Sequence, residues 1–339
     1  MDNSQAKKVF SKFGLVYTAA YWAMAVVITV IGLIVYAVSG NSLAGTASIV
    51  TELVLRFAVM YPVMILIMKK VPTFEIKKNK LGFGKFIACI FITFAVMYLA
   101  TIVGFMINSL VGNLTGTGAV NHFAEVVDNM PKVIRIIAIP ILAPVFEELI
   151  FRKVLIDRIV GYGEVLAMLV SGFMFGLYHM NLLQFIYATA IGIFFAFIYI
   201  RTGKIWYTIV LHLIINGFST FLNTFMTDGI DVTEINNYLS SGDMDGYMNY
   251  INENAAAIAS LSFLGMFVIL ATIIGIILMI VMRKKFVFEH REGEIEKGQR
   301  FKTAILNPGM LIYVIYFAIE IILMLYRTNV FSLIGDLFT

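Results

Sequence analysis

Charge and cysteine are scarce in this sequence. Only 14% of the 339 residues are charged, whereas a soluble domain of this size would carry about 25%. The single cysteine, Cys89, has no partner within the chain, which excludes a disulfide framework. The shortage of charge excludes an ordinary soluble globular protein, and we expect no nucleic-acid partner.

Apolar residues, by contrast, are abundant and occur in long runs. They make up 60% of the sequence, and the mean hydropathy is +0.90. A run of about 18 residues or more can cross a hydrocarbon core of ~30 Å. We therefore predict an all-α fold, a polytopic transmembrane helical bundle of about nine spans that lies in the lipid bilayer. The predicted spans cover residues 14–38, 47–68, 84–110, 133–156, 162–180, 183–200, 204–225, 257–282 and 304–326.

Basic residues collect in alternate connections. They are frequent before the first span, in the loop KKVPTFEIKKNK and over residues 283–302, whereas the acidic loop at residues 227–256 contains no Lys or Arg. Because positively charged loops stay in the cytoplasm, this pattern predicts a cytoplasmic N-terminus, an extracytoplasmic acidic loop and a multi-pass protein of the plasma membrane. The predicted parts are N-terminal transmembrane helices (1–130), a central core (131–226), the acidic loop (227–256) and C-terminal transmembrane helices (257–339).

The stretch FEELIFRKVL, residues 146–155, places ionisable side chains in an otherwise apolar span. A charged residue near the bilayer centre costs about 2.5–3.5 kcal/mol on insertion scales, so such groups need partners, water or a shifted pKa. Glu148 and Arg152 are four residues apart, which places them on one helix face in the orientation that favours an ion pair. Glu147 is rotated by about 100° around the helix and needs a different partner.

Polar side chains in later spans are candidates for that partner. FGLYH places Phe175 and His179 four residues apart, and LHLIIN does the same for His212 and Asn216. A carboxylate, two imidazoles and an amide from three helices can meet in one cavity of a helical bundle. Such a group suits hydrolysis, with Glu147 as the general base toward water and a histidine orienting the water or protonating the leaving amine. Asn216 and the other histidine can stabilise an oxyanion.

The three motifs EExxxR, FxxxH and HxxxN, in this order, resemble those of the CPBP family of intramembrane proteases, also called the CAAX-protease or Abi family. The resemblance covers residues 131–226. It implies an endopeptidase that cleaves a membrane-associated peptide or protein, in which Glu147 and His179 activate water. His212 and Asn216 would stabilise the oxyanion. The supporting motif residues are Glu148, Arg152 and Phe175, and we expect the Glu148–Arg152 pair to hold Glu147 in position.

The sequence leaves the role of a metal open. Glu147, His179 and His212 can supply three zinc ligands and leave a fourth position for water. Against this reading, the sequence contains no HExxH helix, the motif that places two ligands and a base together. We therefore favour a water molecule activated without a cofactor and keep zinc as the alternative.

Two other functions fit the same residues. A non-catalytic membrane immunity or regulatory scaffold protein would retain the motifs and act by binding a partner. A transporter would use the intramembrane carboxylates as a proton relay. A scaffold would not depend on the chemistry of the motif residues, so it should tolerate their replacement. A transporter would instead show proton-coupled flux of its substrate.

The catalytic interpretation makes a demand on the fold. His179 lies at the outer end of the predicted span 162–180, on the far side of the bilayer from Glu147, so a straight helix would keep the two apart. We therefore predict that the turn HMNLLQ, residues 179–184, enters the bundle and that the helix before it is short or tilted. Pro140 and Pro144 predict a kink just before Glu147.

Two further patterns have structural explanations. Glu52 and Arg56 are four residues apart in the second span, and we interpret them as a structural ion pair. Ala188, Gly192 and Ala196 form a stripe of small residues at a spacing of four, which predicts close packing against another helix.

Overall fold

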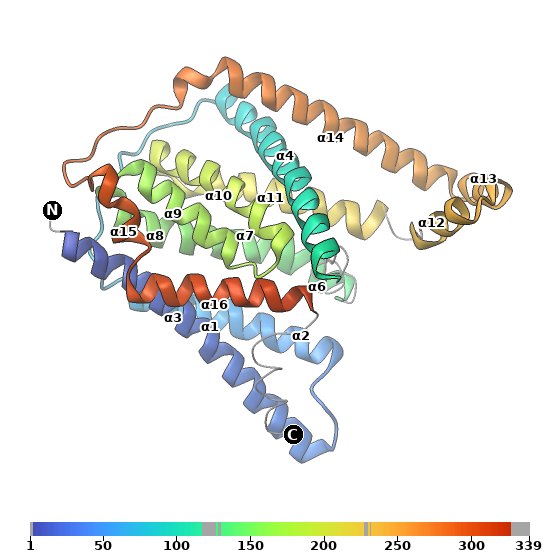
Figure 1. Ribbon diagram of the computed structural model, residues 1–339, viewed down its shortest axis with the longest axis horizontal. Coiled ribbons are helices and arrows are strands. Elements are labelled where there is room, and N and C mark those ends of the chain that lie inside the picture. Colours follow the sequence, from blue (N-terminus) through green and yellow to red (C-terminus); the bar gives the residue numbers. More distant parts are fainter. Residues whose placement is uncertain (1–2, 117–126, 128–129, 227–229, 231, 327–339) are drawn as a thin grey trace.

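The computed structural model describes residues 3–116, 127, 130–226, 230 and 232–326 (Figure 1). Nearly all of these residues are helical and no strand occurs among them, which confirms the predicted all-α fold. Residues 227–229 and 231 of the predicted acidic loop lie outside the described residues.

The N-terminal part consists of three long helical segments. The second of these is a continuous helix whose middle turn is π-helical, wider than an α-helical turn. The bounds are α1 Asn3–Ser39, α2 Gly45–Val54, η1 Leu55–Met60, α3 Tyr61–Met68 and α4 Phe83–Thr115.

The central part begins with the most distorted helix of the bundle. Pro140 lies in its first π-helical segment, and Pro144 is the second residue of the α-helical segment that follows. Because proline cannot donate a backbone hydrogen bond, the expected distortion takes the form of wider turns. The bounds are α6 Lys132–Ile137, η2 Ala138–Leu142, α7 Ala143–Glu148, η3 Leu149–Val154, α8 Leu155–Ile159, η4 Val160–Tyr162, α9 Glu164–Leu177, α10 Leu182–Thr202 and α11 Ile205–Phe221.

The C-terminal part contains two further long apolar helices. The segment predicted as an acidic loop contains two short amphipathic helices, α12 and α13, which the sequence did not predict. The bounds are η5 Leu222–Met226, α12 Val232–Ser241, α13 Met244–Glu253, α14 Ala255–Val281, η6 Arg283–Lys285, η7 Lys297–Gln299, α15 Arg300–Ala304 and α16 Pro308–Leu325.

The protein is a multi-pass integral membrane protein. Within the described residues, six helices are long and apolar enough to cross a bilayer: α1, the continuous helix Gly45–Met68, α4, α10, α14 and α16. The apolar helices α9 and α11 are shorter, and the distorted helix α6–α8 is interrupted by π-helical turns. The count of nine spans and the cytoplasmic N-terminus therefore stay predictions.

The first and last long helices pack directly on each other, and α4 lies between α14 and α10 (Figure 1). A Cβ atom on Gly14 of α1 would lie 2.2 Å from the carbonyl oxygen of Gly309 in α16. Such close approach requires glycine, because any side chain would collide with backbone. The helices on both sides of residues 131–226 thus belong to the bundle that encloses this core.

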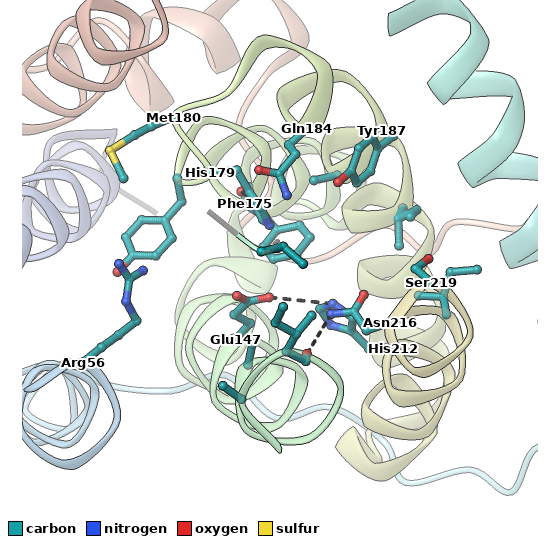
Figure 2. A pocket seen from close by; sticks show the side chains of 18 of the residues that line it. Arg56, Glu147, Phe175, His179, Met180, Gln184, Tyr187, His212, Asn216 and Ser219 are labelled. Atoms are coloured by element: carbon teal, nitrogen blue, oxygen red, sulfur yellow. Dashed lines mark hydrogen bonds and ion pairs between the residues drawn. The ribbon is translucent and has the colours of Figure 1, made fainter. Parts of the chain in front are cut away.

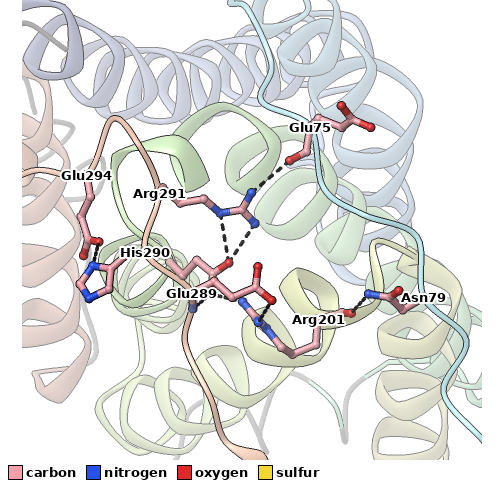
Figure 3. Close-up of polar contacts among 8 residues, drawn as sticks. Glu75, Asn79, Arg201, Glu289, His290, Arg291 and Glu294 are labelled. Atoms are coloured by element: carbon pink, nitrogen blue, oxygen red, sulfur yellow. Dashed lines mark hydrogen bonds and ion pairs between the residues drawn. The ribbon is translucent and has the colours of Figure 1, made fainter.

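An extended connection between α14 and α15 crosses the ends of the central helices (Figure 3). Glu164, the first residue of α9, is buried, and its carboxylate is held by Arg201, Arg291 and the backbone N–H of Glu289. Arg291 Nη2 lies 2.9 Å from Glu164 Oε1, and Arg201 also pairs with Glu289 at 3.2 Å. These ion pairs attach the C-terminal part of the chain to the central core.

Glycines bring α9 and α10 close together, as the stripe of small residues predicted. A Cβ on Gly192 of α10 would lie 2.9 Å from the Cα of Gly172 in α9. At Gly176 of α9, a Cβ would lie 2.6 Å from the carbonyl oxygen of Phe185. Ala188 and Ala196 are buried beside them. The stripe is therefore a packing surface.

We expect Gly176→Val to destabilise the protein by about 1–3 kcal/mol, because the added side chain meets backbone atoms that cannot move independently. The measurement is the midpoint of thermal unfolding in detergent. Gly265→Val in α14 is the matched control, since a Cβ at Gly265 has no described neighbour within 4 Å. Equal midpoints for the two variants would contradict the close packing of α9 on α10.

Candidate active site

A cavity of about 340 Å³ lies inside the bundle. Its volume is typical of a ligand-binding pocket. It is lined by residues of α2, η1, α4, η2, α7, α9, α10 and α11 and of the turn after α9, and Figure 2 shows part of this wall. The structure brings to it all four residues that the sequence singled out for catalysis: Glu147, His179, His212 and Asn216.

His212 lies between two carboxylates. Its Nδ1 donates a hydrogen bond to Glu148 Oε1 at 3.0 Å, and its Nε2 lies 3.7 Å from Glu147 Oε2 (Figure 2). The first contact fixes the orientation of the ring and places the proton of Nδ1. The second is longer than a hydrogen bond, so Nε2 faces the Glu147 carboxylate without a direct hydrogen bond to it. His212 is buried at the cavity wall, with Nε2 directed toward Glu147.

The Glu148–Arg152 ion pair supports His212. Arg152 Nη2 lies 3.1 Å from Glu148 Oε1, the same oxygen that accepts from His212, and both side chains of the pair are 0% exposed. The pairing agrees with the sequence prediction. The group that the pair supports differs from the prediction. We expected the pair to hold Glu147, whereas in the structure it holds the imidazole of His212 in α11.

The ring of Phe175 packs between the charged and imidazole groups. The Arg152 guanidinium lies 4.6 Å from its centroid, in the geometry of a cation–π contact. The His179 and His212 rings meet it edge-on at 4.8 and 5.8 Å between centroids. Phe175 thus sets the separation of the two histidines, which gives a physical reason for an aromatic residue in the second motif.

His179 reaches the cavity because α9 is short. This helix has 14 residues and ends at Leu177, and the turn that follows contains Met180 with a φ of 52°. His179 and Met180 of this turn line the cavity, and so does Gln184 in the first turn of α10. The expected short helix and inward turn are therefore confirmed. His179 Nδ1 lies 2.8 Å from the carbonyl oxygen of Phe175, and donation to this acceptor leaves Nε2 for the cavity.

Asn216 lies one helical turn after His212 and also lines the cavity. Its Nδ2 donates to the carbonyl oxygen of Ile139 at 3.2 Å, in the π-helical segment before Glu147 (Figure 2). This hydrogen bond satisfies a carbonyl in the distorted helix and ties α11 to it. A role of the amide toward an oxyanion stays a prediction.

Glu52 and Arg56 line the same cavity, a placement that sequence reasoning missed. Their ion pair was predicted correctly, since the two side chains are in contact. The signal for more than a structural role was present, because ionisable residues inside a membrane span usually mark a functional site. Other polar residues at the wall that the sequence did not single out are Tyr178, Gln184, Tyr187 and Ser219.

The cavity side chains are not grouped as zinc ligands in this structure. Among the described residues, no three His, Cys, Asp or Glu side chains lie together so that they could hold a metal ion. Each histidine uses Nδ1 for a carboxylate or a backbone carbonyl, as metal-ligating histidines also do, and keeps Nε2 for the cavity. The mechanism below is derived from the residues of the chain, and no step of it passes through a metal.

Comparisons with known proteins agree with the motifs. Residues 129–218 match the sequence model of the type II CAAX prenyl endopeptidase Rce1-like family. The chain is 37% identical over 95 residues to the "Putative membrane peptidase YdiL" of Bacillus subtilis (strain 168), a stretch that covers 28% of this chain and 38% of that protein. The matched stretch thus spans well under half the length of this relative. No solved structure matches. All three motifs fall within residues 129–218, so the segment that carries them is the one that is similar to the Rce1-like family of type II CAAX prenyl endopeptidases.

Proposed function

We propose that the protein is an intramembrane endopeptidase that hydrolyses a peptide bond of a membrane-associated peptide or protein. The observation that carries this proposal is the meeting of Glu147, His179 and His212 at one cavity inside a membrane-embedded bundle. The match of residues 129–218 to a protease family model and the similarity to a putative membrane peptidase support it.

Water activation is the first step of the proposed mechanism. The Glu147 carboxylate removes a proton from a water molecule that His179 orients, and the water oxygen attacks the carbonyl carbon of the scissile bond. The protonated Glu147 then gives this proton to the nitrogen of the leaving amine as the carbon–nitrogen bond breaks. The products are a carboxylic acid and an amine, and Glu147 returns to its ionised form.

Charge on the tetrahedral intermediate is stabilised from α11. In its protonated form, His212 donates from Nδ1 to Glu148 and from Nε2 into the cavity, where the oxyanion develops. Glu148 and Arg152 keep the ring in this orientation, so little reorganisation is needed when the charge appears. Asn216 contributes a second donor when its Nδ2 leaves the carbonyl of Ile139.

Replacing Glu147 by glutamine tests this function. We expect Glu147→Gln to lower the rate of peptide hydrolysis by at least ~10²-fold, because an amide cannot act as a general base. Purified protein in detergent is incubated with membrane-associated peptides and the products are identified by mass spectrometry. Glu292→Gln, which alters an exposed glutamate, is the control. Equal turnover by wild type and Glu147→Gln would refute the proposal and favour a scaffold.

A further inference from the structure

A second charged pair opens onto the cavity that holds Glu147. Glu52 of α2 and Arg56 of η1 line this cavity and pair with each other. Their side chains are 46% and 20% exposed, respectively, whereas Glu148 and Arg152 are both 0% exposed and do not line the cavity. The two i, i+4 pairs therefore differ in kind. One is sealed inside the bundle, and the other can be reached by a molecule in the cavity.

The helix that carries Arg56 is fixed relative to the candidate general base. Arg56 lies in a π-helical turn, a feature found often at functional sites. Phe57 and Tyr61, on the same helix, contact the ring of Phe146 at 5.4 and 5.6 Å between centroids. Phe146 directly precedes Glu147 in the sequence. The aromatic contacts thus join the wall that carries Arg56 to the wall that carries the base.

The charges of the cavity favour an anionic group beside Arg56. Arg56 is the only lysine or arginine among the described residues that line it. Figure 2 shows Arg56 on one side of Glu147, with His212 and Asn216 on the other. Because the Glu147 carboxylate repels a permanent negative charge nearby, a carboxylate that the substrate already carries is best stabilised on the Arg56 side, apart from the oxyanion that forms beside His212 during the reaction. A guanidinium is suited to this, since its planar donors match a carboxylate.

The ion pair with Glu52 shows that Arg56 binds a carboxylate. In the structure this carboxylate comes from the chain itself, from a side chain that is half exposed. The exchange of one carboxylate for another keeps the guanidinium paired, and a carboxylate from a half-exposed side chain is held less firmly than a buried one. A substrate carboxylate can therefore take the place of Glu52, while the Glu52 side chain turns toward the open side of the cavity.

We propose that Arg56 is a specificity-determining residue that binds a carboxylate of the substrate in competition with Glu52. The inference rests on the proposed endopeptidase function and adds a substrate class to it. The substrate is a peptide whose carboxylate, from an acidic side chain or from a free C-terminus, lies within reach of Arg56 when the scissile bond lies at Glu147.

Matched peptides test this inference. Short peptides carry Glu or Gln at one position, scanned along the sequence, and each is made with a free and an amidated C-terminus, so that the two sources of a carboxylate are separated. We expect wild type to prefer the acidic member by about tenfold in kcat/KM, mainly through KM. Arg56→Gln should lose this preference, and Glu52→Gln should raise it by removing the competitor. Lys284→Gln removes an exposed cation beyond α14 and should keep the wild-type ratio.

Binding separates this inference from the proposed function. The same peptides are titrated calorimetrically into Glu147→Gln and into Glu147→Gln with Arg56→Gln. If acidic peptides bind more tightly than neutral ones only when Arg56 is present, the role of Arg56 is supported. If wild type also fails to hydrolyse these peptides, the proposed endopeptidase function is refuted while the role of Arg56 stands. The inference is overturned by the same acid-to-neutral ratio in wild type, Arg56→Gln and Glu52→Gln, or by the absence of binding to any acidic peptide. Should Arg56→Gln fail to fold, an unchanged ratio in Glu52→Gln overturns it alone.

Discussion

Arg152→Met is expected to lower the free energy of unfolding by about 3–5 kcal/mol, because it leaves a buried carboxylate without its cation. Glu148 and Arg152 are both 0% exposed, and their attraction at 3.1 Å offsets the cost of removing two charges from water. Methionine fills much of the same volume beside Phe175 but carries no charge. The Glu148 carboxylate is then left with His212 and Thr208 as its neutral polar partners.

The neighbouring residue supplies the control for this prediction. Lys153 also pairs with a carboxylate four residues later, Asp157, at 2.6 Å, but its side chain is 51% exposed. Lys153→Met should therefore cost no more than about 1 kcal/mol. Equilibrium unfolding in detergent compares the two variants. The double variant Glu148→Gln with Arg152→Met should recover part of the loss, since it removes both buried charges. A loss for Arg152→Met as small as that for Lys153→Met would contradict the role of the pair.

The apolar runs and the local charge pairs could be predicted from the sequence. Helix length follows from the run of apolar residues, and the pairing of Glu148 with Arg152 follows from a spacing of four on one helix. The partner of Glu148 on another helix, His212, could not be predicted from helix periodicity. His212 lies 64 residues further along the chain, and helix periodicity does not say which face of α11 meets α7.

The wall of the cavity shows the same limit. Glu52 and Arg56 were recognised as a pair, but their place opposite His212 depends on how the second helix crosses the central core. Glu164 is a clearer case, because its partners are Arg201 at the end of α10 and Arg291 in the connection before α15, 37 and 127 residues away. Contacts of this length are set by packing of the whole bundle, so a local pattern does not contain them. The motif resemblance succeeded where periodicity could not, since it joins three helices in one pattern.

Removal of the His212 imidazole should produce the largest loss of turnover after that of Glu147. We expect His212→Ala to lower kcat by about 10²–10⁴-fold with a smaller change in KM, because the ring acts on charge that appears only during the reaction. The buried ring also connects Glu147 to the Glu148–Arg152 pair, at 3.7 and 3.0 Å. Glu148→Gln, which keeps a hydrogen-bond acceptor for Nδ1 but removes the charge, should lower kcat less than His212→Ala does.

His290 provides the matched histidine for this comparison. It also faces a carboxylate, with Nδ1 at 2.7 Å from Glu294 Oε2, but its side chain is 94% exposed and it lies in the connection before α15. His290→Ala should keep the wild-type kcat. Single-turnover hydrolysis of one peptide by wild type and the three variants separates the chemical step from binding. If His212→Ala and His290→Ala turn over alike, the imidazole of α11 serves packing, and the oxyanion must be stabilised by other donors of the cavity wall.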